Sequence, residues 1–116
     1  MGRKQLKYAC HIVMICVGVS VAQAQTDPDL KIFSPEDGAV FEAGESIPVK
    51  YEIKPWPGGD HSHIYINHKE AGILRRKKAT FTLDPLPPGK HSICLKVVNK
   101  AHAPIGQVTC INVSRR

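Results

Sequence analysis

The chain has 116 residues, of which 22% are charged and 42% hydrophobic, enough apolar material for the core of one small globular domain. Its formal net charge of +6 at pH 7 is modest, so nothing in the charge requires a nucleic acid or a lipid surface as partner. The sequence has no phosphate-binding Gly loop, no dinucleotide-binding motif and no Ser in a nucleophile-elbow context. These observations favour a binding protein over an enzyme.

Residues 1–24 have the pattern of a secretory signal peptide. Three basic residues within the first seven precede an apolar run over residues 12–21, and small residues then offer a cleavage site before Gln25. The run is shorter than the about 20 residues that a transmembrane helix needs, so we predict no stable membrane insertion. We expect a periplasmic or secreted protein; the alternative is a segment retained as an anchor.

Cleavage before Gln25 would leave one domain, residues 25–116. Three of the 16 basic residues fall in the signal, so 13 remain against 10 acidic residues and the net charge drops to +3. Two of the four Cys also leave with the signal. The remaining two, Cys94 and Cys110, form an even pair in an oxidising compartment.

Short segments that favour β-strands, separated by Pro, Gly and Asp, fill this domain. We expect strands at residues 30–33, 39–41, 47–53, 63–67, 72–74, 80–83, 91–99 and 105–113. The clearest is 47–53, where apolar residues alternate with polar ones in the period of a half-buried strand. No segment has a sustained helical period. About seven short strands at this spacing predict an all-β, Ig-like (fibronectin-III-like) antiparallel β-sandwich.

The last two predicted strands can be aligned with each other. If their hairpin is centred on His102, Ile93 lies opposite Ile111 and Cys94 lies opposite Cys110. Opposed Cβ atoms of an antiparallel pair are about 4.5–5.5 Å apart, close to the about 3.8 Å of a disulfide. We therefore predict a Cys94–Cys110 disulfide on the outer face; free thiols or a copper–thiolate pair are the alternatives.

Four parts of the chain resemble known domains. Residues 32–54 resemble the opening of bacterial immunoglobulin-like and fibronectin-III-like domains. Residues 60–67, 86–97 and 100–106 are similar to a family of small exported Ig-like proteins of unknown function. Members of that family have clustered His before a hydrophobic strand, then an L-P-x-G-x-H segment, then a last hairpin that contains His. The resemblance implies an exported Ig-like sandwich with a His-rich strand.

The chain differs from that family at two places. The family usually has three adjacent His where this chain has His61, Ser62 and His63. It often has a further His near the last turn, where this chain has Ala-Pro-Ile-Gly at residues 103–106. The residues that remain therefore have to be assessed one by one.

Three His are expected to meet at one pole of the sandwich. In an Ig-like sandwich the third and sixth strands are antiparallel neighbours. The start of the third strand, at His61 and His63, then lies beside the end of the sixth, and His102 follows in the turn. The loop before the third strand brings Asp60 and Trp56 to the same pole.

These residues form a predicted metal site. Residues i and i+2 of a strand point to the same side, so His61 and His63 can bind one ion and His102 can supply a third imidazole. Three imidazoles with the nearby carboxylate of Asp60 suit Cu(II) or Zn(II), with copper ahead of zinc, in a carrier or sensor. The alternative is that the two strand His are ordinary outward polar residues, since Ile64 is expected to face the core.

The remaining His are expected at the opposite pole. His91 is in phase with Ile93 and follows a Pro-Gly corner, where sandwich folds often place a side chain that bonds to backbone across the corner. We predict a structural role for it and leave it, with His68, outside the metal site.

One basic run and one Trp offer a second kind of function. Arg75, Arg76, Lys77 and Lys78 connect two short strands and are predicted to be a solvated loop or a charged edge. They, or Trp56 between two prolines, are also the candidate contacts for another exported protein or an anionic partner. A metal-free Ig-like interaction module is therefore the alternative to a metal-binding protein.

Overall fold

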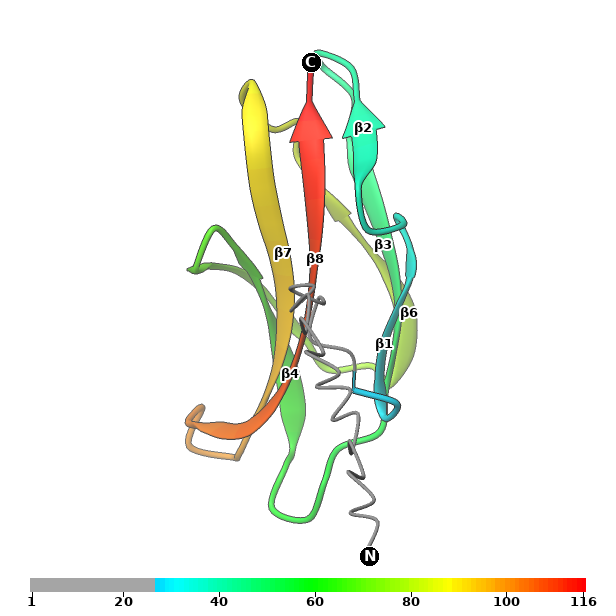
Figure 1. Cartoon of the computed structure of the whole chain (residues 1–116). Coiled ribbons are helices and arrows are strands. Elements are labelled where there is room, and N and C mark those ends of the chain that lie inside the picture. Colours follow the sequence, from blue (N-terminus) through cyan, green and yellow to red (C-terminus); the bar gives the residue numbers. More distant parts are fainter. Residues whose placement is uncertain (1–26) are drawn as a thin grey trace, which may run out of the picture.

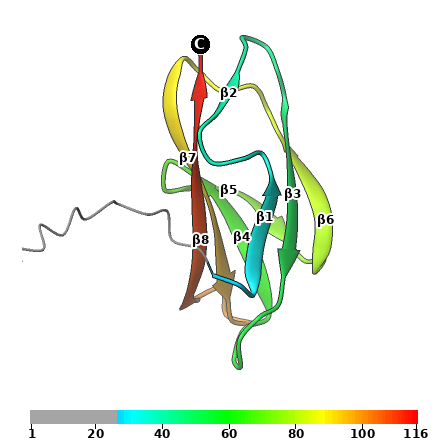
Figure 2. The ribbon, with the colours of Figure 1, turned by 45° about the vertical axis from the view of Figure 1, so that its right-hand side comes forward.

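The computed structural model describes residues 27–116, which form eight β-strands in two facing sheets and no helix (Figures 1 and 2). The strands are β1 (Leu30–Ser34), β2 (Ala39–Phe41), β3 (Ile47–Ile53), β4 (His61–Ile66), β5 (Lys69–Leu74), β6 (Lys78–Leu83), β7 (Gly89–Val98) and β8 (Pro104–Arg115). One sheet has the order β1-β3-β6 and the other the order β2-β8-β7-β4-β5. The predicted all-β sandwich is confirmed. The predicted signal peptide lies outside the described residues.

The strand pairing departs from the predicted one in two details. The pairing of β2 with β8 is parallel, while the other strand pairs are antiparallel. β4 begins at His61, two residues earlier than expected, because the N–H of Asp60 already donates to the carbonyl of Val98 on β7 at 2.8 Å. Both His61 and His63 therefore lie inside the strand. None of the described residues belongs to a helix long and apolar enough to cross a membrane.

Apolar side chains from both sheets fill the space between them. In β3, Ile47, Val49, Tyr51 and Ile53 are buried while residues between them face out, as the alternating pattern predicted. Ile64 of β4 packs into the same core and is fully buried. Burying an aliphatic side chain of this size contributes about 1.5–3 kcal/mol, so these residues fix which face of each strand is outside.

The predicted disulfide is confirmed. Cys94 on β7 lies opposite Cys110 on β8, and Ile93 lies opposite Ile111, as predicted. Nearer the turn a register shift pairs Val98 with Pro104, so there the hairpin is not centred on His102. The bond closes a loop with a sequence separation of 16 and stabilises the fold by about 3 kcal/mol on the chain-entropy model. It ties together the two strands whose hairpin carries His102.

Candidate metal site

Two His of the candidate site share the outer face of β4. His61 and His63 are two residues apart, so their side chains leave the strand on the same side. They pair across to Val98 and Lys96 of β7, which confirms the predicted neighbourhood of these two strands. At the lower end of Figure 1 the start of β4 meets the orange β7–β8 hairpin. That hairpin helps to cover the two rings, each of which is 4% exposed.

The third His comes from the turn of the β7–β8 hairpin. The side-chain oxygen of Asn99 accepts the N–H groups of Ala101 and Ala103, at 2.9 and 3.0 Å, and the carbonyl of Asn99 accepts the N–H of His102 at 3.0 Å. His102 itself has φ of 63°, a left-handed conformation in which His is enriched among non-Gly residues. Asn99 thus shapes the turn that directs the His102 ring onto β4.

The three rings bring one nitrogen each to a common point. The Nε2 atoms of His61 and His63 are 3.0 Å apart, and Nδ1 of His102 lies 3.3 Å from the first and 3.0 Å from the second. An ion at a bond length of about 2.0–2.1 Å from each nitrogen would have N–metal–N angles of roughly 90–110°. Tetrahedral and square-based coordination both use angles in this range.

The outer nitrogens of the two strand His face carboxylates. Nδ1 of His61 lies 2.8 Å from Oδ2 of Asp60, and Nδ1 of His63 lies 3.4 Å from Oε1 of Glu70. The Asp60 carboxylate accepts a hydrogen bond from Nδ1 of His61, which leaves a lone pair on Nε2 of that neutral ring. Glu70 lies at ion-pair distance from Nδ1 of His63 and favours the same tautomer there. A carboxylate behind a ligating His is the usual arrangement around bound metals, because it fixes the tautomer and orientation of the ring.

The inner nitrogens need a positive partner. Two lone pairs 3.0 Å apart repel each other, and among the three neutral rings only His102 has a proton to offer. One proton cannot lie on the line to both Nε2 atoms at once. A cation among the three nitrogens satisfies all of them, so the geometry suits a metal ion.

Asp60 has a different place from the one predicted. The sequence predicts it among the ligands, but its carboxylate contacts the ring nitrogen of His61 that points away from the other two rings. In the part of the chain that the structure describes, the group of potential ligand atoms within 4.8 Å of one another consists of His61, His63 and His102. The side chain of Asp60 therefore lies behind a ligand and not among the ligands.

The surroundings of the site favour a neutral His63 and an ionised Asp60, which are the protonation states that metal binding requires. Burial lowers the pKa of His63 below its usual value of 6.5; Glu70 opposes this, and the nearby charges of His61, His102 and Arg75 add to it. The hydrogen bond from His61 holds the pKa of Asp60 below its usual 3.8. Near neutral pH, His63 is thus uncharged and Asp60 is ionised.

Sequence reasoning missed three residues that support the site. Glu70 reaches His63 because a register shift in the β4–β5 pairing places it opposite Tyr65. Gln107 on β8 is buried; its side-chain oxygen accepts the N–H of Trp56 at 2.9 Å and its amide donates to the carbonyl of Lys54 at 3.0 Å. These bonds fasten the β3–β4 loop, which leads into Asp60.

Gly59 is the third residue that was missed, and it fits this loop tightly against the sheet. A Cβ atom at this position would come within 2.7 Å of a methyl group of Val97. Only a residue without a side chain allows the approach. The approach determines where the neighbouring Asp60 meets β4.

The predicted contact residues are exposed at the same pole or near it. Trp56 in the β3–β4 loop is 42% exposed. The basic run is exposed and connects β5 to β6, with Lys78 as the first residue of β6. Arg75 directly follows Leu74, which pairs with Ser62 of β4, so the run begins beside His61.

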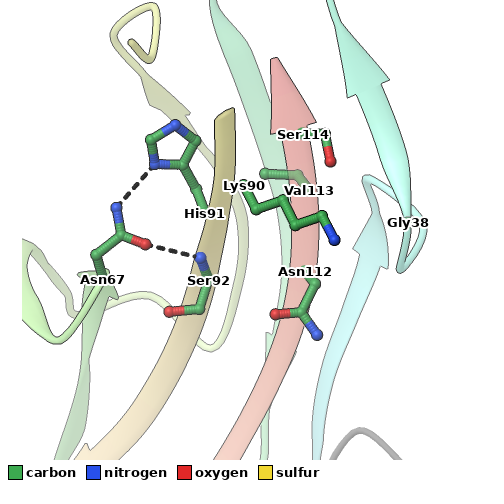
Figure 3. Close-up of a pocket in the computed structure, with 8 residues that line it drawn as sticks. All are labelled: Gly38, Asn67, Lys90, His91, Ser92, Asn112, Val113 and Ser114. Atoms are coloured by element: carbon green, nitrogen blue, oxygen red, sulfur yellow. Dashed lines mark hydrogen bonds between the residues drawn. The ribbon is translucent and has the colours of Figure 1, made fainter. Parts of the chain in front are cut away.

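The structural role predicted for His91 is confirmed. Its Nε2–H donates to the carbonyl of Pro87 at 2.7 Å, across the corner before β7. Its Nδ1 accepts from the side-chain amide of Asn67 at 2.8 Å, and the oxygen of that amide accepts the N–H of Ser92 at 2.9 Å (Figure 3). Both ring nitrogens are thus used within the fold.

Comparison with known proteins supports the fold. The chain matches no protein-family model and no curated protein sequence. Its structure is similar to the fibronectin(III)-like modules of Clostridium thermocellum CbhA, with a TM-score of 0.62, 18% identity, and coverage of 74% of this chain and 93% of that chain. A Jonesia denitrificans lytic polysaccharide monooxygenase has a TM-score of 0.46, 12% identity and coverage of 71% and 60%. The Clostridium perfringens spore cortex lytic enzyme SleM has a TM-score of 0.45, 13% identity and coverage of 67% and 28%.

The first of these similarities assigns the fold. The chain has a fibronectin-III-like sandwich, and the similarity extends over nearly the whole of that module. A fold of this kind hosts many functions, so function has to be argued from the His cluster and its surroundings.

Proposed function

We propose that the protein binds one Cu(II) or Zn(II) ion, copper in preference, and acts as an exported metal carrier or sensor. His61, His63 and His102 are the ligands, and Asp60 and Glu70 orient the two strand His. The observation that carries the proposal is the approach of three ring nitrogens to within 3.0–3.3 Å of one another, on rings whose other nitrogens face carboxylates.

The ligand set favours copper. For a given nitrogen site, affinity rises along the first-row metals to Cu(II) and falls again at Zn(II). Neutral imidazoles suit both ions, and the pKa of His63, lowered by burial, keeps that ring available near neutral pH. A three-nitrogen site without a thiolate suits Cu(II) better than Cu(I), since Cu(I) is selected by soft sulfur ligands.

Binding is preferred over catalysis because both carboxylates near the cluster are already engaged. Asp60 and Glu70 face ring nitrogens, so neither is free to act as a base toward a substrate. Export is supported by the signal-like pattern of residues 1–24 and by the Cys94–Cys110 disulfide, which fits an oxidising compartment. The metal would then be collected in the periplasm or outside the cell.

A second candidate is a metal-free interaction module. The observation that favours it is the exposure of Trp56 and of the basic run Arg75–Lys78. An exposed Trp near a loop end is the kind of residue that anchors protein interfaces. In a metal carrier the same residues would meet the exported protein that receives the ion.

Calorimetric titration separates the two candidates. The purified, oxidised and metal-stripped protein is titrated with Cu(II) and with Zn(II), beside a His61→Ala/His63→Ala variant. The matched control is His68→Asn, which removes an exposed His outside the cluster and keeps a residue that tolerates its positive φ. One-to-one binding that the double variant loses and the control keeps supports the metal site. Binding no tighter than millimolar would reject it in favour of the interaction module.

A further inference from the structure

The proposed metal site is incomplete, and a further inference concerns what completes it. Within the described residues the ligand group holds three nitrogens, whereas Cu(II) and Zn(II) take four or more ligands. The two nearest carboxylates cannot swing in without leaving the ring nitrogens that they orient. At least one coordination position therefore has to be filled by a ligand other than the side chains of residues 27–116.

Two cationic residues lie on segments next to the ligands. Arg75 comes one residue after Leu74, whose partner Ser62 adjoins both strand His, so its backbone lies at the level of His61. Lys100 belongs to the hairpin turn that carries His102 and lines a pocket together with Asp60 and Asn99. Both residues are exposed, and neither belongs to an ion pair of the described residues.

Both residues start from segments that carry or adjoin the ligands. Arg75 follows Leu74, the partner of Ser62 between the two strand His, and Lys100 is two residues before His102 in the same turn. The negative charges nearby, on Asp60 and Glu70, are turned toward ring N–H groups. A divalent ion on three neutral rings adds two further positive charges, so the loaded site carries an excess of positive charge.

We infer that the open coordination position binds a small anion, and that Arg75 and Lys100 select an anionic ligand over a neutral one. This inference rests on the proposed metal site. The bound species is then a metal–anion pair. The three His hold the metal, and Arg75 and Lys100, the two rim cations, attract the anion.

The test uses the Cu(II)-loaded protein with azide as the anionic probe and imidazole as the neutral one. Both ligands coordinate through nitrogen, so their difference reports charge. Azide is followed by its charge-transfer absorption and imidazole by the change in the electron paramagnetic resonance spectrum. The variant Arg75→Gln/Lys100→Gln should bind azide about three- to tenfold more weakly, with imidazole binding unchanged. The matched control Lys90→Gln removes an exposed cation from the pocket that lies beside His91, outside the metal cluster (Figure 3).

The outcomes separate this inference from the proposed function. Copper titration of the same samples reports the metal site first, and a wild type that binds no copper refutes the proposed function itself. If copper binds but neither probe perturbs its spectrum, the position is not open and the inference is wrong. Equal losses of azide affinity in the rim variant and in Lys90→Gln, or equal losses for azide and imidazole, would overturn the selecting role of Arg75 and Lys100.

Discussion

The described His that are largely buried lie in two places. The two places differ in the partners of their ring nitrogens. At the corner before β7, both nitrogens of His91 find partners within the fold, Pro87 and Asn67 (Figure 3). At the start of β4, the outer nitrogens of His61 and His63 find carboxylates while their inner nitrogens face each other. Burial alone therefore does not distinguish a structural His from a candidate ligand. The partner of the second nitrogen does.

The largest expected effect comes from removing one ligand of the His cluster. His102→Asn removes a ligand, so it should weaken Cu(II) binding by more than about a hundredfold. Replacing a residue that only supports a ligand typically weakens binding by less than that. His102 is exposed and Asn tolerates its positive φ, so the free energy of unfolding of the metal-free protein should change by less than about 0.5 kcal/mol. Titration calorimetry and urea unfolding measure the two quantities.

His91→Ala is expected to lower the stability of the fold and to leave copper affinity unchanged. It leaves the carbonyl of Pro87 and the amide of Asn67 without their buried partner, which should cost about 1–3 kcal/mol of stability. Copper affinity should stay at the wild-type value. If His91→Ala reduced copper affinity as strongly as His102→Asn, the two regions would not be independent and the comparison would fail.

Removing the carboxylate behind a ligand should have the next largest effect. Asp60→Asn keeps the size of the side chain but removes the charge that holds the proton on Nδ1 of His61. We expect a 10- to 100-fold loss of Cu(II) affinity, the usual range for such partners. Asp84→Asn, an exposed Asp in the β6–β7 loop, is the control and should bind copper normally.

Glu70→Gln should weaken copper binding less than Asp60→Asn. The Glu70 carboxylate is farther from its ring nitrogen, 3.4 Å against 2.8 Å, and its side chain is 48% exposed, so water can replace it. A loss of less than about tenfold is expected. Measuring both variants in one titration series ranks the two carboxylates, and a larger loss for Glu70→Gln would show that the ranking by distance is wrong.

The convergence of the three His could be predicted from the sequence because it depends on coarse features. The period of two puts His61 and His63 on one side of β4, and the register that pairs Cys94 with Cys110 puts His102 in the β7–β8 turn. The register shift between Lys96 and Val98, which moves the centre of that turn, was not predicted. The pairing of β4 with β7 then follows from the sandwich topology.

The surrounding residues could not be predicted because they depend on finer features. Glu70 reaches His63 through a register shift of one residue, which no periodic pattern encodes. The side of the His61 ring that Asp60 contacts is decided by side-chain torsions. Gln107 is in phase with apolar residues of β8, so the pattern indicated a strand position but not its bonds to the β3–β4 loop.

The smallest expected effect is a pH dependence of the metal-free protein. Burial lowers the pKa of folded His63, while in the unfolded chain the group titrates near 6.5. Between these values the unfolded chain binds more protons than the folded one, so the contribution of His63 is fully present above about pH 6.5 and is lost as pH falls toward the folded pKa. Urea midpoints at about pH 7.5 and about pH 5.5 should therefore differ, with the lower stability at the lower pH. In His63→Gln the difference should shrink, because the substituted side chain does not titrate. An undiminished difference would assign the pH dependence to other groups, and the buried ring of His63 would then bind protons as freely in the fold as in the unfolded chain.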